Sequence, residues 1–224
     1  MRECAVHAAH SLLGLQRFVK RPVSAKRYPF GPAAYNSGVT TSMVSQSSKI
    51  LIVPGLYGSG PEHWQTQWEN HHPAFSRVEQ ANWNTPDCDD WVGSLDAAVR
   101  NENDNVILVG HSLGSVMIVH WASRYGRKIV GALLVAPSDT EASGFPKGTT
   151  GFSPIPTCRL PFPSTVIAST DDPYISIERV TALADGWGSN LVSLGPCGHI
   201  SVADGFGPWP DGIRYIAAIQ NAAR

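Results

Sequence analysis

The stretch Val109-Gly-His-Ser-Leu-Gly-Ser115 places Ser112 at the centre of a Gly-x-Ser-x-Gly pentapeptide. A serine on a tight turn between a strand and a helix needs backbone angles that crowd its neighbours, so glycine is wanted two residues before it and two after it. Gly110 and Gly114 meet that need. Because a helix-start serine between glycines gives the same pattern by chance, the flanking sequence has to decide between the two interpretations.

The flanking sequence favours a strand, a sharp turn and a helix, in that order. Val106 to Val109 is a short aliphatic run, typical of a parallel strand buried on both faces. Apolar residues recur from Val116 to Trp121, and Gly126 is suited to ending a helix. We therefore expect Ser112 on a nucleophile elbow, where backbone N–H groups at the start of the helix can hold a developing oxyanion.

Apolar runs of strand length alternate with helical patterns along the rest of the chain. The expected strands are Ile50–Val53, Val106–Val109, Ile129–Val135, Thr165–Ala168 and Leu191–Leu194, with Arg77–Ala81 a weaker candidate. The expected helices carry Trp64 and Trp68, Trp91 to Val99, Val116 to Trp121, Ile177 to Trp187, and Ile213 to Ile219. This alternation predicts an α/β fold, with a mainly parallel central sheet covered by helices on both faces and sites at the carboxyl ends of the strands. Residues 137–163 lack apolar periodicity, so we expect a minimal cap domain or none.

Length and charge indicate one domain with a basic extension. A chain of 224 residues, 42% of them apolar, can bury one good α/β core, which we expect over residues 43–224. Six of the 17 basic residues but only one of the 18 acidic residues lie before Met43, which leaves 11 basic and 17 acidic residues in the domain. Its net charge of about −6 argues against a nucleic-acid partner.

Residues 1–42 have the composition of a terminal extension, with Pro, Ser and Gly scattered among the basic residues. We interpret them as a disordered extension, or as a stretch upstream of a start at Met43, and a mitochondrial presequence is the alternative. No apolar segment reaches the length of a secretory core or a membrane span, so we expect no membrane partner. The expected location is therefore cytoplasmic, with mitochondrial targeting as the alternative.

The four cysteines, Cys4, Cys88, Cys158 and Cys197, are widely separated and form no Cys-x-x-Cys pair. Their spacing predicts neither a disulfide framework nor a metal site, and it fits a reduced compartment. Cys197 lies two residues before His199, but its surroundings do not resemble an elbow. We interpret Cys197 as a packing residue.

A serine hydroxyl needs an imidazole to accept its proton and an acid to orient that imidazole. On an elbow of this kind the chain order is Ser, then Asp or Glu, then His. His199 is the one histidine beyond the helix that follows Ser112, and it lies in a glycine-rich turn after the last expected strand. We therefore expect His199 to be the catalytic base.

The acid has three candidates. Asp171 and Asp172 follow the expected strand Thr165–Ala168, whereas Asp139 follows the strand that ends at Val135. Pro173 disfavours helix at the preceding residue and so favours Asp172 on a turn at the end of a strand. Asp and Pro also populate turns for local reasons alone, so Asp171 and Asp139 stay open as alternatives at this point.

The loop from Pro54 to Pro61 is rich in glycine and follows the first expected strand. It is suited to turning the backbone N–H of Leu56 toward Ser112, so we predict an oxyanion hole formed by the N–H groups of Leu56 and Leu113. A glycine-rich phosphate cradle is the alternative, but the Lys-Ser/Thr ending of a P-loop is missing. His63 and Trp209 are candidate substrate-binding residues.

With these residues placed, the sequence from Lys49 to the C-terminus resembles the small serine hydrolases of the YdeN and retinoblastoma-binding protein nine family, within the α/β-hydrolase superfamily. The segments that carry the resemblance are Pro54–Gln65, Gly110–Gly114, Leu160–Ser164, Asp171–Tyr174, Gly195–Ile200 and Gly205–Pro210. The resemblance implies a compact α/β-hydrolase fold that is nearly without a cap, a triad of Ser112, Asp172 and His199, and no cofactor.

We therefore expect a serine hydrolase that cleaves a small ester or an activated acyl bond through an acyl-enzyme. An amidase or aminopeptidase is the nearest alternative, because the same residues serve either bond. A protein-interaction module on the same fold is the alternative from another class, since fold does not determine function. The Leu-x-Cys-x-Glu motif used to bind retinoblastoma protein is missing, so any protein partner stays unknown.

Overall fold

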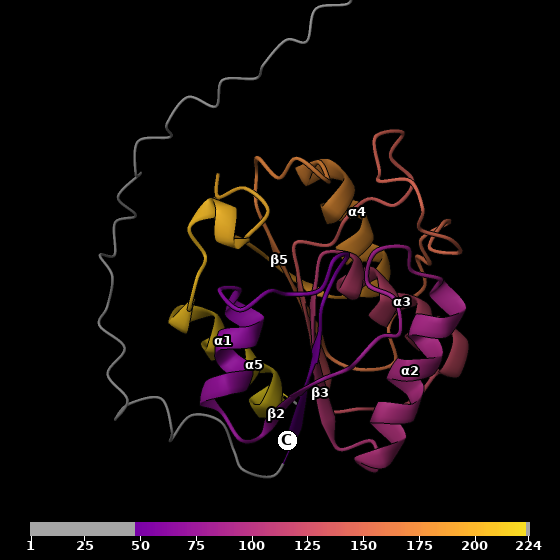
Figure 1. Cartoon of the computed structure of the whole chain (residues 1–224), viewed down its shortest axis with the longest axis vertical. Coiled ribbons are helices and arrows are strands. Elements are labelled where there is room, and N and C mark those ends of the chain that lie inside the picture. The colour runs from indigo at the N-terminus through magenta and orange to yellow at the C-terminus, as the bar shows by residue number, and fades with distance from the viewer. Residues whose placement is uncertain (1–47, 223–224) are drawn as a thin grey trace, which may run out of the picture. The chain divides into compact units, whose positions relative to one another are not determined.

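The computed structural model describes residues 48–222, in which six strands form one parallel sheet (Figure 1). The strands are β1 (Lys49–Val53), β2 (Phe75–Arg77), β3 (Val106–His111), β4 (Gly131–Val135), β5 (Ser164–Ala168) and β6 (Asn190–Ser193). Their order is β2-β1-β3-β4-β5-β6, so β3 lies inside the sheet and all six of its residues are buried. The aliphatic run that begins at Val106 therefore forms an interior strand, as its composition predicts.

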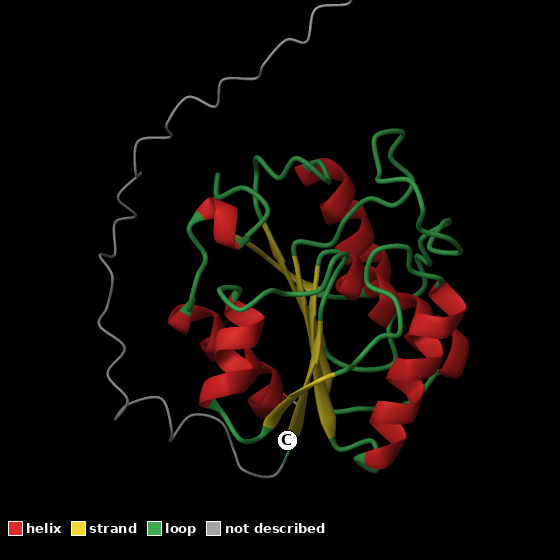
Figure 2. Cartoon of the chain, viewed as in Figure 1, coloured by secondary structure: helices red, strands yellow, loops and turns green. Residues whose placement is uncertain are grey.

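Helices cover both faces of this sheet (Figure 2). One face carries α1 (Trp64–His71) and α5 (Ile213–Ala222), and the other carries α2 (Cys88–Asn101), α3 (Leu113–Tyr125) and α4 (Ile177–Trp187). Each set of helices closes a separate apolar core against the sheet. The predicted α/β-hydrolase architecture is thus confirmed, and the two cores hold the strands in register.

Local sequence sets the ends of the helices. The Asp87 side chain accepts hydrogen bonds from the backbone N–H groups of Asp89 and Asp90, and so caps the start of α2. Gly126 and Gly188 adopt the left-handed conformation and end α3 and α4. Glycine reaches this conformation without steric cost, which explains why both helices end there.

Some element boundaries differ from those predicted. The edge strand β2 is Phe75–Arg77, whereas the sequence pointed to Arg77–Ala81. Pairing with β1 decides the matter, because Phe75 lies opposite Ile50 and the last ladder bond runs from the Val78 N–H to the Ile52 carbonyl at 2.9 Å. A three-residue edge strand has no apolar run of its own from which to be recognised.

The segment between β4 and β5 is described throughout and contains neither a helix nor a strand of its own. An isolated bridge joins Thr150 to Asp87 at the start of α2, so the segment packs onto the domain as a loop. This agrees with the expected minimal cap. Among residues 48–222, no helix has both the length and the apolar character needed to cross a bilayer. The predicted extension over residues 1–42 lies outside the described residues.

Candidate active site

Ser112 lies between β3 and α3 on a turn that only small neighbours permit. Its φ of 56° and ψ of −126° are rare for a residue with a side chain. A Cβ atom at Gly110 would lie 2.7 Å from Ser115 Cα, and one at Gly114 would lie 2.6 Å from the Pro54 carbonyl oxygen. Both glycines are therefore needed for close backbone packing, which is the reason predicted for the pentapeptide.

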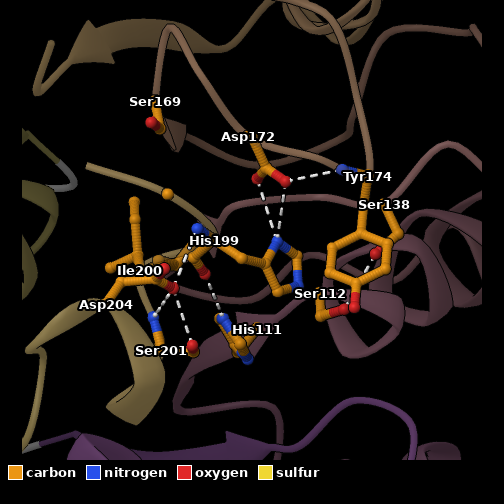
Figure 3. Close-up of polar contacts among 12 residues, drawn as sticks. His111, Ser112, Ser138, Ser169, Asp172, Tyr174, His199, Ile200, Ser201 and Asp204 are labelled. Atoms are coloured by element: carbon orange, nitrogen blue, oxygen red, sulfur yellow. Dashed lines mark hydrogen bonds and ion pairs between the residues drawn. The ribbon is translucent and has the colours of Figure 1, made fainter. Parts of the chain in front are cut away.

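His199 and Asp172 form a buried pair beside Ser112 (Figure 3). The Nδ1 atom of His199 lies 2.9 Å from one carboxylate oxygen of Asp172 and 3.0 Å from the other. Because an ionised carboxylate can only accept, Nδ1 carries the hydrogen and Nε2 is left to accept a proton. The backbone N–H of Tyr174 also donates to Asp172, at 2.9 Å, and fixes the carboxylate.

The loop that carries His199 is held on several sides. Its backbone N–H donates to the Asp204 carboxylate at 3.0 Å, and its carbonyl oxygen accepts from His111 Nε2 at 2.9 Å. The ring of Tyr174 meets the His199 ring edge-on, with centroids 4.5 Å apart. His111 belongs to the elbow itself, so its hydrogen bond ties the loop of His199 directly to the turn of Ser112.

The two other carboxylates considered for the acid have different partners. Asp171 accepts from the Ser169 hydroxyl and from the Gly198 N–H, both at 2.8 Å. Asp139 lies 3.6 Å from Arg179 Nε. Of the three candidates, it is Asp172 whose carboxylate contacts the imidazole, and Asp171 instead braces the loop in front of His199.

Ser138 is a neighbour of Ser112 that the sequence did not single out. The two hydroxyl oxygens lie 2.8 Å apart, and either can be the donor (Figure 3). Within the described residues, Ser138 is the side-chain partner of the Ser112 hydroxyl, which is not hydrogen-bonded to His199 in this arrangement. No motif marks Ser138, although it follows the end of β4 and so lies at the edge where a site was expected.

A cavity of about 420 Å³ opens above these side chains. Its wall contains Ser112, Ser138 and His199 together with the glycine-rich loop after β1, and Leu56 and His63 also line it. None of the described residues that line it is a lysine or an arginine. Asp204 is the one carboxylate among the described residues on the wall, and it accepts hydrogen bonds from the His199 N–H and the Ser201 hydroxyl.

The predicted oxyanion donors lie on two segments that approach each other closely. A Cβ atom at Gly55 would lie 2.9 Å from Ser112 Cβ and 3.2 Å from the Leu113 nitrogen. Leu113 is the first residue of α3, so its N–H is not used by the helix ladder. Leu56 follows Gly55 in the loop after β1 and lines the same cavity as Ser112, and the oxyanion hole of Leu56 and Leu113 stays a prediction.

His63 is a neutral histidine in the wall of the cavity. Its Nδ1 accepts from the Gln65 N–H at 3.2 Å and caps α1. Burial, and then the charges of Arg77 and His199, lower the pKa of His63 to about 4. Burial also holds the pKa of the neighbouring His111 well below its usual value. Both rings are consequently uncharged at neutral pH.

Trp209, the second candidate for substrate binding, is not among the residues that line the cavity. Its ring stacks on Trp68 with centroids 5.7 Å apart and meets Trp64 edge-on at 5.2 Å. The indole of Trp64 donates to the Ile200 carbonyl at 3.0 Å, and that of Trp68 donates to the Pro208 carbonyl at 2.9 Å. These three rings, the tryptophan cluster, pack α1 against the segment that follows His199.

Cys197 is buried in the core formed with α1 and α5. Burial raises the pKa of its thiol, which keeps it protonated at neutral pH. Cys88, Cys158 and Cys197 are free thiols in the described part of the chain, and Cys4 lies outside it. These features agree with a packing role for Cys197.

Comparisons with known proteins identify the family of the chain. A family model described as serine hydrolase matches residues 50–218. A crystal structure of a putative YdeN-like hydrolase from Pectobacterium atrosepticum is 33% identical, with a TM-score of 0.71, covering 80% of this chain and 93% of that one. The ydeN gene product from B. subtilis is 19% identical, with a TM-score of 0.61, covering 77% of this chain and 98% of that one.

A carboxylesterase from Bacillus cereus has the same fold, at 15% identity and a TM-score of 0.51, with 81% of this chain and 91% of that one covered. The search of curated proteins finds no significant match. The family model spans most of the chain, and the YdeN-like hydrolase exceeds 30% identity over nearly its whole length. The chain therefore belongs to the serine hydrolase family, in its YdeN-like branch of the α/β-hydrolase superfamily.

Proposed function

We propose that this serine hydrolase cleaves small, uncharged esters through an acyl-enzyme, with Ser112 as nucleophile, His199 as general base and Asp172 as the acid that orients His199. The observation that carries the proposal is the contact between Asp172 and His199 Nδ1 at 2.9 Å, because His199 lines the same cavity as Ser112, a serine on a strained elbow. Such a pair leaves Nε2 of His199 as a proton acceptor on the side of the cavity.

In the proposed reaction, the Ser112 hydroxyl first turns from Ser138 toward His199. Its proton passes to His199 Nε2 while Oγ bonds to the ester carbonyl carbon, and the carbonyl oxygen becomes an oxyanion held by the N–H groups of Leu56 and Leu113. The bond to the alcohol then breaks, and the alcohol leaves with the proton from His199. Water, activated by His199, repeats the sequence and releases the acid.

The substrate class follows from the charge and the size of the cavity. About 420 Å³ accommodates a small acyl ester, and a wall without cations offers an anionic acyl group no counter-charge. Leu56, Phe145 and Tyr57 give the cavity an apolar side. The fold shared with the Bacillus cereus carboxylesterase supports esters before amides as the first substrates to test.

The test is labelling of the full chain with a fluorophosphonate probe, followed by peptide mapping. We expect one equivalent of probe on Ser112, hydrolysis of p-nitrophenyl acetate, and loss of both in Ser112→Ala, which removes one oxygen and leaves the turn intact. Labelling of another residue, or full turnover by the variant, would refute the assignment. A folded protein that neither labels nor hydrolyses esters would favour an interaction module on this fold.

A further inference from the structure

Ser138 is a buried hydroxyl in contact with the proposed nucleophile. It is 2% exposed, it lines the cavity, and its Oγ lies 2.8 Å from Ser112 Oγ. A buried hydroxyl needs a hydrogen-bond partner, and the one given to Ser138 is the reacting oxygen of the site (Figure 3). The contact therefore has to be maintained or replaced at every step of the reaction.

The backbone fixes Ser138 in this position. Ser138 follows β4, which pairs with the elbow strand β3, and the Ser112 N–H donates to the Val135 carbonyl at 3.0 Å. On the other side, the Ala136 N–H donates to the Ile167 carbonyl at 2.8 Å, and the Asp139 N–H donates to the Tyr174 carbonyl at 3.0 Å. The segment is thus anchored before and after Ser138, and its hydroxyl is preorganised against Ser112.

A hydroxyl can donate and accept, so the direction of the Ser112–Ser138 bond can reverse. While Ser112 donates to Ser138, its proton points away from His199. Once the Ser112 proton turns to His199, Ser138 keeps its hydrogen bond only by donating to Ser112 Oγ. That donation is strongest when Ser112 Oγ carries negative charge, because charge-assisted hydrogen bonds are about twice as strong as neutral ones.

We propose that Ser138 is a further catalytic residue, whose hydroxyl donates to Ser112 Oγ as this oxygen loses its proton to His199, and again as it leaves the acyl-enzyme. No bond at Ser138 breaks, and its proton stays on its own oxygen throughout. The proposal rests on Ser112 being the nucleophile. It adds a third donor to the two N–H groups of the oxyanion hole, directed at the attacking oxygen instead of the carbonyl oxygen.

The experiment compares Ser138→Ala and Ser138→Thr with the wild-type full chain. Removing the donor should slow both the fluorophosphonate labelling of Ser112 and the kcat for p-nitrophenyl acetate by about 10- to 100-fold, the size expected for a hydrogen bond to a charged group. Threonine keeps the hydroxyl and can place its methyl group in the cavity, so it should recover most of the rate. Neither variant should shift Tm by more than about 3 °C.

Ser164→Ala is the matched control. Ser164 and Ser189 form another Ser–Ser hydroxyl pair, 2.6 Å apart, at the start of β5 and therefore at the opposite end of the strand from Asp172. Its loss should change the labelling rate by no more than about twofold, since it does not contact Ser112. This control separates the loss of a partly buried pair of serine hydroxyls in general from the loss of the pair at the nucleophile.

The outcomes distinguish this proposal from the proposed function. If wild type labels at Ser112 and Ser138→Ala labels equally fast, the role of Ser138 is refuted and the hydrolase assignment stands. Equal slowing in the alanine and threonine variants would also refute it, because the hydroxyl would then not be the active group. If wild type does not label at Ser112, or labels at Ser138, both proposals fall together.

Discussion

Asp172 and Asp171 are adjacent in sequence and differ completely in what their side chains do. The Asp172 carboxylate accepts hydrogen bonds from His199 Nδ1 and the Tyr174 N–H. The Asp171 carboxylate accepts them from the Ser169 hydroxyl and the Gly198 N–H. The first carboxylate sets the tautomer of the imidazole, and the second shapes the turn that presents it. One aspartate therefore contacts the imidazole, and its neighbour in sequence holds the loop that carries it.

Asp172→Asn should lower kcat by about 10³- to 10⁴-fold with little loss of stability, because an amide can donate to His199 Nδ1 and stabilise the wrong tautomer. Steady-state hydrolysis of p-nitrophenyl acetate and thermal unfolding measure the two effects. Asp139→Asn is the control, since Asp139 faces Arg179 at 3.6 Å, and it should stay within a few-fold of wild type. A larger loss in the Asp139 variant would move the acid to that position.

Among single residues, the sequence predicts those that a motif or their order along the chain identifies. Ser112 has a five-residue signature, and His199 is the one eligible histidine. The order of the chain alone does not choose between Asp171 and Asp172, because a one-residue step on a turn redirects the side chain. Ser138 has no motif, since it is selected by the pairing of β3 with β4, which brings residues 26 positions apart into contact.

At the scale of elements, the elbow depends on how closely α3 approaches the end of β1. A side chain at Gly114 would collide with the carbonyl oxygens of Val53 and Pro54. Val53 is the last residue of β1 and Pro54 follows it directly, so neither carbonyl can move aside without disturbing the pairing between β1 and β3. Close packing of helix against strand is therefore what permits the strained conformation of Ser112.

Gly114→Ala should lower the free energy of unfolding by several kcal/mol, since overpacking against fixed backbone is among the costlier single substitutions. Gly93→Ala is the opposite case. Gly93 lies within α2, and a Cβ atom added there would meet no other atom within 4 Å, so alanine should stabilise the protein by about 0.5–1 kcal/mol. Urea unfolding of both variants tests the pair, and a Gly114 variant as stable as wild type would contradict this account of the elbow.

Elements with a clear period or a capping residue could be predicted from sequence. The helix Ile177–Trp187 is confirmed at both ends, and the interior strands are confirmed within two residues of their predicted bounds. The weaker candidate Arg77–Ala81 was wrong at both ends and shares only Arg77 with the edge strand β2, because three residues paired on one side carry too little pattern. Trp209 illustrates another limit: an aromatic residue near a site packs in a core as readily as it lines a cavity.

For the whole molecule, the buried neutral histidines beside the active site make the stability of the fold depend on pH. His63 and His111 lie with ring centroids 4.7 Å apart, and His111 lies 4.9 Å from His199. In the unfolded chain a histidine takes up a proton near pH 6.5, whereas His63 in the folded protein does so only near its pKa of about 4. Between these values the unfolded state binds more protons, so stability falls as the pH falls.

We expect the free energy of unfolding to drop by about 3 kcal/mol from His63 alone as the pH is lowered from about 7 to 4, with His111 acting in the same direction. His63→Asn keeps an oxygen acceptor that can cap α1 but removes the titrating ring. It should therefore flatten the dependence of stability on pH, measured by urea unfolding at several pH values. An unchanged slope would show that His63 is not the titrating group.

The tryptophan cluster gives this part of the molecule an intrinsic spectroscopic signal. Trp64, Trp68 and Trp209 are close enough for their excited states to couple, and two of the three indoles hydrogen-bond to carbonyl groups of the segment after His199. Detachment of that segment would change the emission wavelength and the aromatic circular dichroism before the sheet itself unfolds. Intrinsic fluorescence thus offers a label-free signal for whether the histidine loop is seated on the enzyme.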